Sequence, residues 1–221
     1  MRYGLVLCGQ HPLVSGAYRD VYQYPDDDDF LIKTIKPLAR ERHRQRLTWY
    51  NAWRRAGHYK TLLRELNEYL AIERRGQAPF PFVQHWLGLV ATDLGFGMVV
   101  RKVRGRDGGL APTLAAEVAR SGFTAELRAR FDELIEDVAR RHILWSDLSP
   151  TNVLVANDPI HGDRLVIIDG LGDRRWIPVN AMSFTANRFS LIRHARRLVR
   201  TLEQIEQARR PAPALLVVAP D

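Results

Sequence analysis

The sequence predicts an α+β protein of two lobes, a β-rich lobe followed by a helical lobe. Short β-branched and aromatic runs, separated by turn residues, fill most of the chain up to about residue 103. From Thr113 onward the apolar residues recur at helical spacing, and the glycine-rich segment 105–109 separates the two patterns. A length of 221 residues suffices for two small lobes that share a cleft. We therefore expect an N-lobe at 1–104, a C-lobe at 105–210 and a loosely held tail at 211–221.

The N-lobe is expected to be an antiparallel sheet with a helical insertion. Asp26–Asp29 beside Pro25 is typical of a hairpin turn, and so is Asp93-Leu94-Gly95. Residues 30–35, Phe-Leu-Ile-Lys-Thr-Ile, form the clearest strand pattern. The strands predicted for this lobe cover residues 3–8, 21–24, 30–35, 84–92 and 95–103.

Two helices are predicted between the third and fourth of these strands. Residues 40–57 are strongly basic, and a solvated helix with an aromatic packing face is favoured over a nucleic-acid or head-group site there. Residues 60–75 make the clearer helix, because leucines and an isoleucine recur at three- and four-residue spacing. Gly76 and Pro79 are expected to end it.

The C-lobe is expected to be mainly helical. Thr113 and Thr124 are predicted helix caps, the second beginning a helix that runs to about Arg141. Two short apolar strands, 153–156 and 164–169, follow with a polar turn between them. A last helix is predicted at 187–209.

Composition limits the classes of function. No segment approaches 18 uncharged apolar residues, so no transmembrane helix is expected, and the short apolar run at the N-terminus favours a cytoplasmic protein over a secreted one. The single cysteine, Cys8, excludes an intramolecular disulfide and a cysteine-based zinc site. The net charge of +8 is mostly arginine and is compatible with an anionic partner, although charge alone identifies none. Nucleic acid is the less favoured partner.

The most informative motif is Asp147-Leu-Ser-Pro-Thr-Asn152-Val, followed by Asp169 at the end of an apolar strand. An aspartate, an asparagine five residues later and a second aspartate after a strand are the spacing of a phosphoryl-transfer site. Asp147 is the candidate catalytic residue that orients or deprotonates an acceptor hydroxyl. Asn152 and Asp169 are candidate Mg²⁺ ligands, because carboxylate and amide oxygens suit that ion. A turn role for Asp147 and a backbone-tying role for Asn152 are the alternatives.

Four N-lobe residues are candidates for binding the nucleotide. Lys33 lies within an apolar strand, and such a lysine is explained by a phosphate ligand and a carboxylate partner on a nearby helix. We predict Glu65 as that partner, with Glu68 as the alternative. Ser15 and Gly16 belong to a turn of small residues before this strand, where backbone N–H groups can approach a phosphate.

These residues, taken in order, resemble the protein-kinase-like fold, and more closely the bacterial PhoP regulatory network protein YrbL family. The resemblance covers about residues 12–180 and is most specific at 147–154 and in Ile168-Asp-Gly-Leu-Gly172. It implies ATP and Mg²⁺ as cofactors.

The motifs also depart from those of protein kinases. Trp145-Ser146 replaces the usual His-Arg, and Asp169-Gly-Leu171 replaces Asp-Phe-Gly. The favoured function is an ATP- and Mg²⁺-dependent phosphotransferase acting on a hydroxyl, whose unknown acceptor is compatible with an anionic small molecule or a glycolipid. The alternative is a weak or inactive pseudokinase that binds nucleotide or a partner as a regulator.

Overall fold

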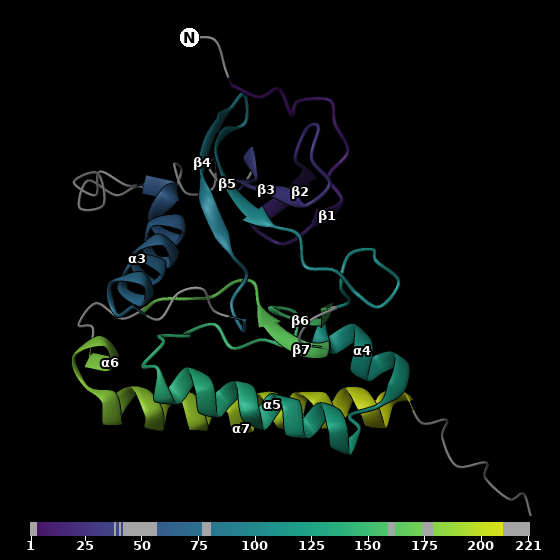
Figure 1. Cartoon of the computed structure of the whole chain (residues 1–221), viewed down its shortest axis with the longest axis vertical. Coiled ribbons are helices and arrows are strands. Elements are labelled where there is room, and N and C mark those ends of the chain that lie inside the picture. The colour runs from purple at the N-terminus through teal and green to yellow at the C-terminus, as the bar shows by residue number, and fades with distance from the viewer. Residues whose placement is uncertain are drawn as a thin grey trace, which may run out of the picture.

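The computed structural model describes residues 4–37, 39, 41, 57–76, 81–158, 162–173 and 179–209. Within these ranges the chain forms a β-rich lobe and a helical lobe, as the sequence predicts (Figure 1). The twisted sheet and α3 (Lys60–Arg74) occupy one end. The two long helices α5 (Ala125–Arg140) and α7 (Phe184–Arg209) lie side by side at the other end. The small sheet of β6 (Val153–Asp158) and β7 (Gly162–Ile167) lies between them and the N-lobe. The exact lobe bounds 1–104 and 105–210 remain predictions.

The N-lobe sheet has five antiparallel strands in the order β1-β2-β3-β5-β4. Its strands are β1 (Val14–Ser15), β2 (Arg19–Gln23), β3 (Phe30–Ile35), β4 (Trp86–Thr92) and β5 (Gly95–Arg101). β3 has the predicted bounds, and its central residues are buried. The strand predicted at 3–8 is wrong: within the described part of it, only Leu5 pairs, in an isolated bridge to Thr92.

The short 3₁₀ turn η1 (Gly57–Tyr59) leads into α3 (Lys60–Arg74), which matches the predicted helix closely. Its buried side chains include two carboxylates, Glu65 and Glu68, beside Leu62 and Ile72. Leu63 and Leu70, two of the leucines that predicted the helix, are instead exposed, at 39% and 48%. The helix thus turns acidic residues inward, which an apolar periodicity does not anticipate. The predicted basic helix at 40–57 lies almost wholly outside the described residues.

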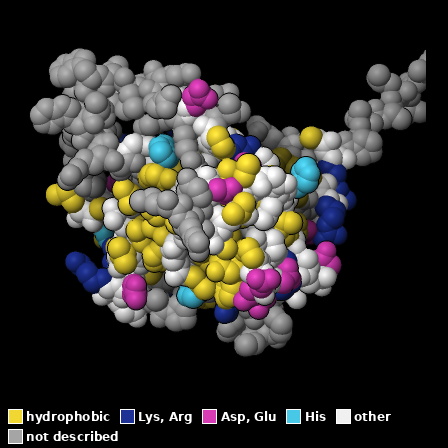
Figure 2. All heavy atoms as spheres, turned by 90° about the horizontal axis from the view of Figure 1, so that it is seen from above, with side chains coloured by type: hydrophobic (Ala, Val, Ile, Leu, Met, Phe, Trp, Pro, Cys, Tyr) yellow, Lys and Arg dark blue, Asp and Glu magenta, His cyan; other side chains and the backbone are white. Residues whose placement is uncertain are grey.

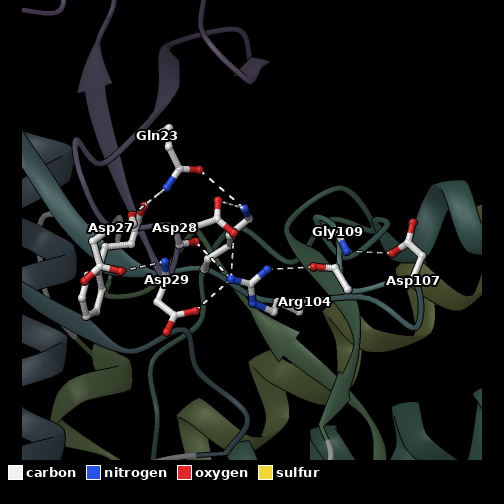
Figure 3. Close-up of polar contacts among 10 residues, drawn as sticks. Gln23, Asp27, Asp28, Asp29, Arg104, Asp107 and Gly109 are labelled. Carbon is white, nitrogen blue, oxygen red and sulfur yellow. Dashed lines mark hydrogen bonds and ion pairs between the residues drawn. The ribbon is translucent and has the colours of Figure 1, made fainter.

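Charged side chains of the β2–β3 turn hold the segment that leaves the sheet for the C-lobe (Figure 3). Lys102 Nζ donates to Asp28 Oδ1 at 2.6 Å, and its backbone N–H donates to the carbonyl of Asp29 at 2.7 Å. Arg104 Nη2 donates to carboxylate oxygens of Asp28 and Asp29, both at 2.9 Å, while Nη1 donates to the carbonyl of Gly108 at 2.8 Å. The acidic turn predicted at 26–29 therefore also holds the segment that connects the two lobes.

The C-lobe contains α4 (Leu114–Ser121), α5 (Ala125–Arg140), the hairpin β6 (Val153–Asp158) and β7 (Gly162–Ile167), α6 (Val179–Met182) and α7 (Phe184–Arg209). Both predicted caps are confirmed, since Thr113 Oγ1 accepts from the N–H of Ala116 and Thr124 Oγ1 from that of Leu127. One apolar core joins α4, α5, α7 and the hairpin, and it includes Ile72 of α3. The predicted tail lies outside the described residues.

Burial along β4 alternates, so one face of the sheet edge is covered and the other faces outward. Leu87, Leu89 and Phe96 are exposed there, and Figure 2 shows hydrophobic side chains gathered on the face seen from the β-rich end. Across the described ranges, no helix combines the length and the apolar character needed to cross a bilayer.

Candidate nucleotide and phosphoryl-transfer site

Backbone hydrogen bonds bring the segments of Asp147 and Asp169 together. The N–H groups of Ser146 and Asp147 both donate to the carbonyl of Gly170, at 3.1 and 3.2 Å. The predicted catalytic segment, residues 144–152, follows shortly after α5. It is anchored by Trp145, which is 3% exposed and bridges to Leu171 and Gly172. The loop predicted to carry the catalytic aspartate is thus fastened to the turn predicted to bind the metal.

Asn152 joins the same cluster from the start of β6. Its Nδ2 donates to the carbonyl of Asp147 at 3.1 Å, and its own carbonyl accepts from the N–H of Ile168 at 2.9 Å. The backbone-tying role left open by the sequence is therefore real. Because the amide nitrogen makes this bond, the amide oxygen is the atom with which Asn152 would bind a cation.

The oxygen atoms that Asp169 and Asn152 offer as ligands fit a magnesium ion that is held largely by phosphates. Asp169 Oδ1 accepts from the N–H of Gly170 at 2.6 Å, and its side chain is 33% exposed. The described ranges contain no cluster of three or more His, Cys, Asp or Glu side chains that could hold a metal alone. One carboxylate and one amide oxygen are few ligands for a free ion. They suit Mg²⁺ that arrives with substrate phosphates and keeps several waters.

Lys33 is buried at 7% exposure but does not pair with Glu65. Its Nζ donates to Gln84 Oε1 and to the carbonyl of Ile168, both at 2.6 Å. Gln84 in turn donates from Nε2 to the carbonyl of Arg101 at 2.8 Å. Lys33 thus ties β3 to the residue before Asp169 and, through Gln84, to the end of β5. The prediction of an ion pair between Lys33 and Glu65 is therefore wrong.

Glu65 is paired with Arg19 of β2, a residue that sequence reasoning missed. Nη1 and Nη2 of Arg19 donate to Oε2 and Oε1 of Glu65 at 2.9 and 2.7 Å. Nη1 also lies 3.6 Å from Asp169 Oδ2. Such a two-pronged pair is the strongest geometry available to a guanidinium and a carboxylate. Glu65 belongs to the cluster as predicted, with a different cation.

Glu68, the alternative partner for Lys33, has another task. Its Oε1 accepts the backbone N–H of Leu144 at 3.0 Å, and the residue is 4% exposed. α3 therefore holds the start of the catalytic segment through one glutamate and Arg19 through the other. Neither glutamate is bonded to Lys33.

Burial and neighbouring charges shift the ionisation of this cluster. Burial raises the pKa of Glu65 to about 7, against the opposing influence of Arg19, and lowers the pKa of Lys33 to about 8. Burial would also raise the pKa of Asp169, but Arg19, a hydrogen bond with Glu65 and Lys33 together hold it near 2. The carboxylates of Glu65 and Asp169 more than offset the burial of Arg19 and raise its pKa. Asp169 is therefore ionised at neutral pH, as a metal ligand must be.

Ser15 is the last residue of β1, and Gly16 follows it in the β1–β2 turn. The N–H of Gly16 donates to the carbonyl of Arg19 at 2.9 Å, and Ser15 Oγ donates to Asp20 Oδ1 and accepts from Lys36 Nζ, both at 2.7 Å. These groups are used within the turn. The phosphate-binding roles of Ser15 and Gly16 stay predictions.

Two glycines explain why the motif reads Asp-Gly-Leu-Gly. Gly170 and Gly172 have φ of +87° and +85°. A Cβ on Gly170 would lie 2.6 Å from Cβ of Asp147, and one on Gly172 would lie 2.7 Å from the carbonyl oxygen of Arg64. Leu171 between them is 2% exposed in the C-lobe core. The turn after Asp169 thus packs against both the catalytic segment and α3.

A groove of about 660 Å³ lies elsewhere, among α4, α5 and the β6–β7 hairpin. It includes none of the predicted site residues. Its arginines are paired with carboxylates, for example Arg106 with Asp163 and Arg130 with Glu126. Volume alone gives it no chemistry, so the candidate site remains the cluster around Asp169.

The fold is similar to that of a solved kinase structure. The structure titled "Crystal structure of Rad53 1-466 in complex with AMP-PNP" aligns with a TM-score of 0.53 and 17% identity, over 90% of this chain and 50% of that one. The chain thus spans about half the length of the Rad53 chain. Identity this low shows the fold alone. No curated protein matches the sequence.

The family comparison covers most of the chain. The family described as PhoP regulatory network protein YrbL matches residues 5–203, which include all seven predicted site residues from Ser15 to Asp169. The chain therefore belongs to the YrbL family of the PhoP regulatory network and has a protein-kinase-like fold.

Proposed function

We propose that the protein is an ATP- and Mg²⁺-dependent phosphotransferase that acts on a hydroxyl acceptor. The observation that supports it best is that hydrogen bonds join the segments of Asp147, Asn152 and Asp169. The acceptors of these bonds are the carbonyls of Gly170, Asp147 and Asn152. Two cations, Arg19 and Lys33, also lie beside Asp169. Phosphoryl transfer asks the protein mainly for positioning and charge stabilisation, and these residues provide both.

In the proposed reaction, Asn152 and Asp169 hold the metal that accompanies the nucleotide. Asp147 accepts the proton of the acceptor hydroxyl as its oxygen bonds to the γ-phosphorus. The bond from that phosphorus to the β–γ bridging oxygen breaks, and ADP leaves. The formal charge of +8 is compatible with an anionic acceptor such as a phosphorylated small molecule or a glycolipid.

The first test combines nucleotide binding with phosphoryl transfer. Calorimetric titration with AMP-PNP, with and without Mg²⁺, measures binding. Transfer of the labelled γ-phosphate to the protein, to water or to hydroxyl acceptors measures turnover. Asp147→Asn should bind nucleotide like the wild type and lose about 100-fold or more in transfer rate.

Asp132→Asn, an exposed aspartate of α5, is the matched control and should leave both measurements unchanged. Wild-type protein that binds no nucleotide with Mg²⁺ would refute the proposal. So would transfer by Asp147→Asn at the wild-type rate.

One observation favours a second function, nucleotide binding without turnover. Nη1 of Arg19 is 3.6 Å from Asp169 Oδ2, so a cation already stands beside the oxygen that a metal would use. A regulatory pseudokinase would bind nucleotide and transfer no phosphate, and Asp147→Asn would leave its cellular function intact.

A further inference from the structure

Two cations lie beside Asp169, and they make different contacts. Both ammonium bonds of Lys33 go to uncharged oxygens, those of the Gln84 side chain and the Ile168 backbone. The guanidinium of Arg19 contacts two carboxylates, Glu65 and Asp169. Lys33 therefore connects parts of the scaffold, whereas Arg19 connects α3 to the metal-binding aspartate.

The register of the sheet explains how a β2 residue reaches this place. Arg19 pairs with Ile35 and Val21 pairs with Lys33 across the β2–β3 ladder. Directly opposed residues share a face of the sheet, as do residues two apart on one strand. Arg19 and Lys33 are thus diagonal neighbours on one face. The side chain of Arg19 is 12% exposed, so its charge lies mostly out of water.

A guanidinium also has donors to spare. The fork to Glu65 uses one N–H of each terminal nitrogen, and Nη1 also lies 3.6 Å from Asp169 Oδ2. The second N–H of Nη2 takes no part in these contacts. Fixed by Glu65 and adjacent to Asp169, the group is preorganised to bind the phosphate oxygens of a nucleotide whose metal sits at Asp169.

We propose that Arg19, anchored by Glu65, is the side chain that binds the nucleotide phosphates, and that Lys33 holds the scaffold beneath Asp169. The inference rests on the proposed function, because it assumes that a nucleotide binds at Asp169. It gives to Arg19 both tasks that the sequence assigned to Lys33, the binding of phosphate and the pairing with a helix carboxylate.

The test compares ligands that differ in phosphate number. With Mg²⁺ present, calorimetry measures the affinities of Arg19→Met and wild-type protein for AMP-PNP, ADP and adenosine. Loss of a charged hydrogen-bond donor should weaken AMP-PNP binding about tenfold or more. Adenosine binding should not change. A merely structural effect would weaken all three ligands alike.

Two further variants keep the test decisive. Arg19→Met alone leaves Glu65 buried without its cation, so Arg19→Met/Glu65→Met removes both charges and serves if the single variant unfolds. It should show the same phosphate-dependent loss. Arg128→Met, which breaks the Arg128–Glu203 pair between α5 and α7, is the matched control and should bind every ligand like the wild type.

The outcomes separate the two proposals. Wild-type protein that binds no nucleotide in the presence of Mg²⁺ overturns the proposed function and this inference together. Nucleotide binding that Arg19→Met leaves intact overturns the inference alone. The same holds if Lys33→Met loses more affinity for AMP-PNP than Arg19→Met does and keeps its affinity for adenosine.

Discussion

At the scale of single residues, Gly170 determines whether Asp147 and Asp169 can approach. The carbonyl of Gly170 accepts both N–H groups at the start of the catalytic segment. Its missing side chain lets Asp147 pack where a Cβ would otherwise be. The spacing of the motif is thus supported by a contact that only glycine permits.

Gly170→Ala should therefore destabilise the protein more than a positive φ alone explains. The matched control is Gly162→Ala at the start of β7, where φ is +66° and no atom of the described residues, apart from its chain neighbours, lies within 4 Å of the added Cβ. The control should cost about 1–2 kcal/mol in free energy of unfolding. Gly170→Ala should cost more, because its Cβ would lie 2.6 Å from that of Asp147. Urea denaturation measures both, and equal losses would contradict the packing argument.

The two buried glutamates of α3 make stability depend on pH. Burial raises the pKa of Glu65 and of Glu68 to about 7, from a value of 4.5 in water. Between those values the folded protein binds more protons than the unfolded chain, so stability falls as pH rises from about 4.5 to about 7. Asp169, with its lowered pKa, acts in the opposite direction below about pH 4.

Glu68→Gln should reduce this fall by roughly 2–3 kcal/mol, because the amide oxygen still accepts the N–H of Leu144 and no longer titrates. Urea denaturation at pH 5 and pH 7 measures it. Glu73→Gln, an exposed glutamate of the same helix, is the control and should keep the wild-type pH dependence. If Glu68→Gln keeps the wild-type pH dependence of stability, the carboxyl of Glu68 is not held protonated by burial.

At the scale of elements, the acidic β2–β3 turn and the segment after β5 act as one unit. Figure 3 shows Arg104 between the carboxylates of the turn and the loop that includes Gly109. The backbone continues the connection, since the carbonyl of Arg104 accepts from Asn157 of β6 at 2.9 Å. The contacts connect the turn of one lobe to the hairpin of the other.

Arg104→Ala should lower the free energy of unfolding only slightly at low salt, because its carboxylate partners are well exposed. The loss should shrink in 1 M NaCl, where such charges are screened. Denaturation at the two salt concentrations measures it, with exposed Arg74→Ala of α3 as the control. A salt-independent loss would point to the bonds with backbone carbonyls instead.

At the scale of the whole molecule, the candidate site joins the two lobes. Lys33 of the N-lobe sheet bonds the carbonyl of Ile168, and Gln84 N–H donates to the carbonyl of Ile167 at 2.8 Å. A ligand bound to Arg19 and Asp169 together would contact both lobes. Its binding should therefore stabilise the fold as a unit.

Mg²⁺ with AMP-PNP at 100 times its dissociation constant should raise the free energy of unfolding by about 2.7 kcal/mol. Hydrogen exchange should slow in β2, in α3 and at residues 169–172 together. Asp169→Asn is the comparison and should lose the Mg²⁺-dependent part of both effects. Protection confined to one lobe would contradict a site shared between them.

Much of the fold follows from local pattern. β3 and α3 were predictable because their periodicities and turn residues are local, and the caps Thr113 and Thr124 are defined within three residues of sequence. The strand expected at 3–8 failed because an apolar run does not say whether a neighbouring strand edge is available. Glu65 and Glu68 were predicted to be candidates that face the site, but their partners were missed, because Arg19 and Leu144 are distant from them in sequence.

The sequence by itself determined the family and the Asp147–Asn152–Asp169 spacing, because these residues lie in adjacent turns around one hairpin. Only the tertiary structure decided which cation serves Glu65. Lys33 and Arg19 lie on neighbouring strands, and their contacts depend on the register of β2 against β3 and on the approach of α3. Local spacing carries no information about either, so the partner of a buried carboxylate is a property of the assembled fold.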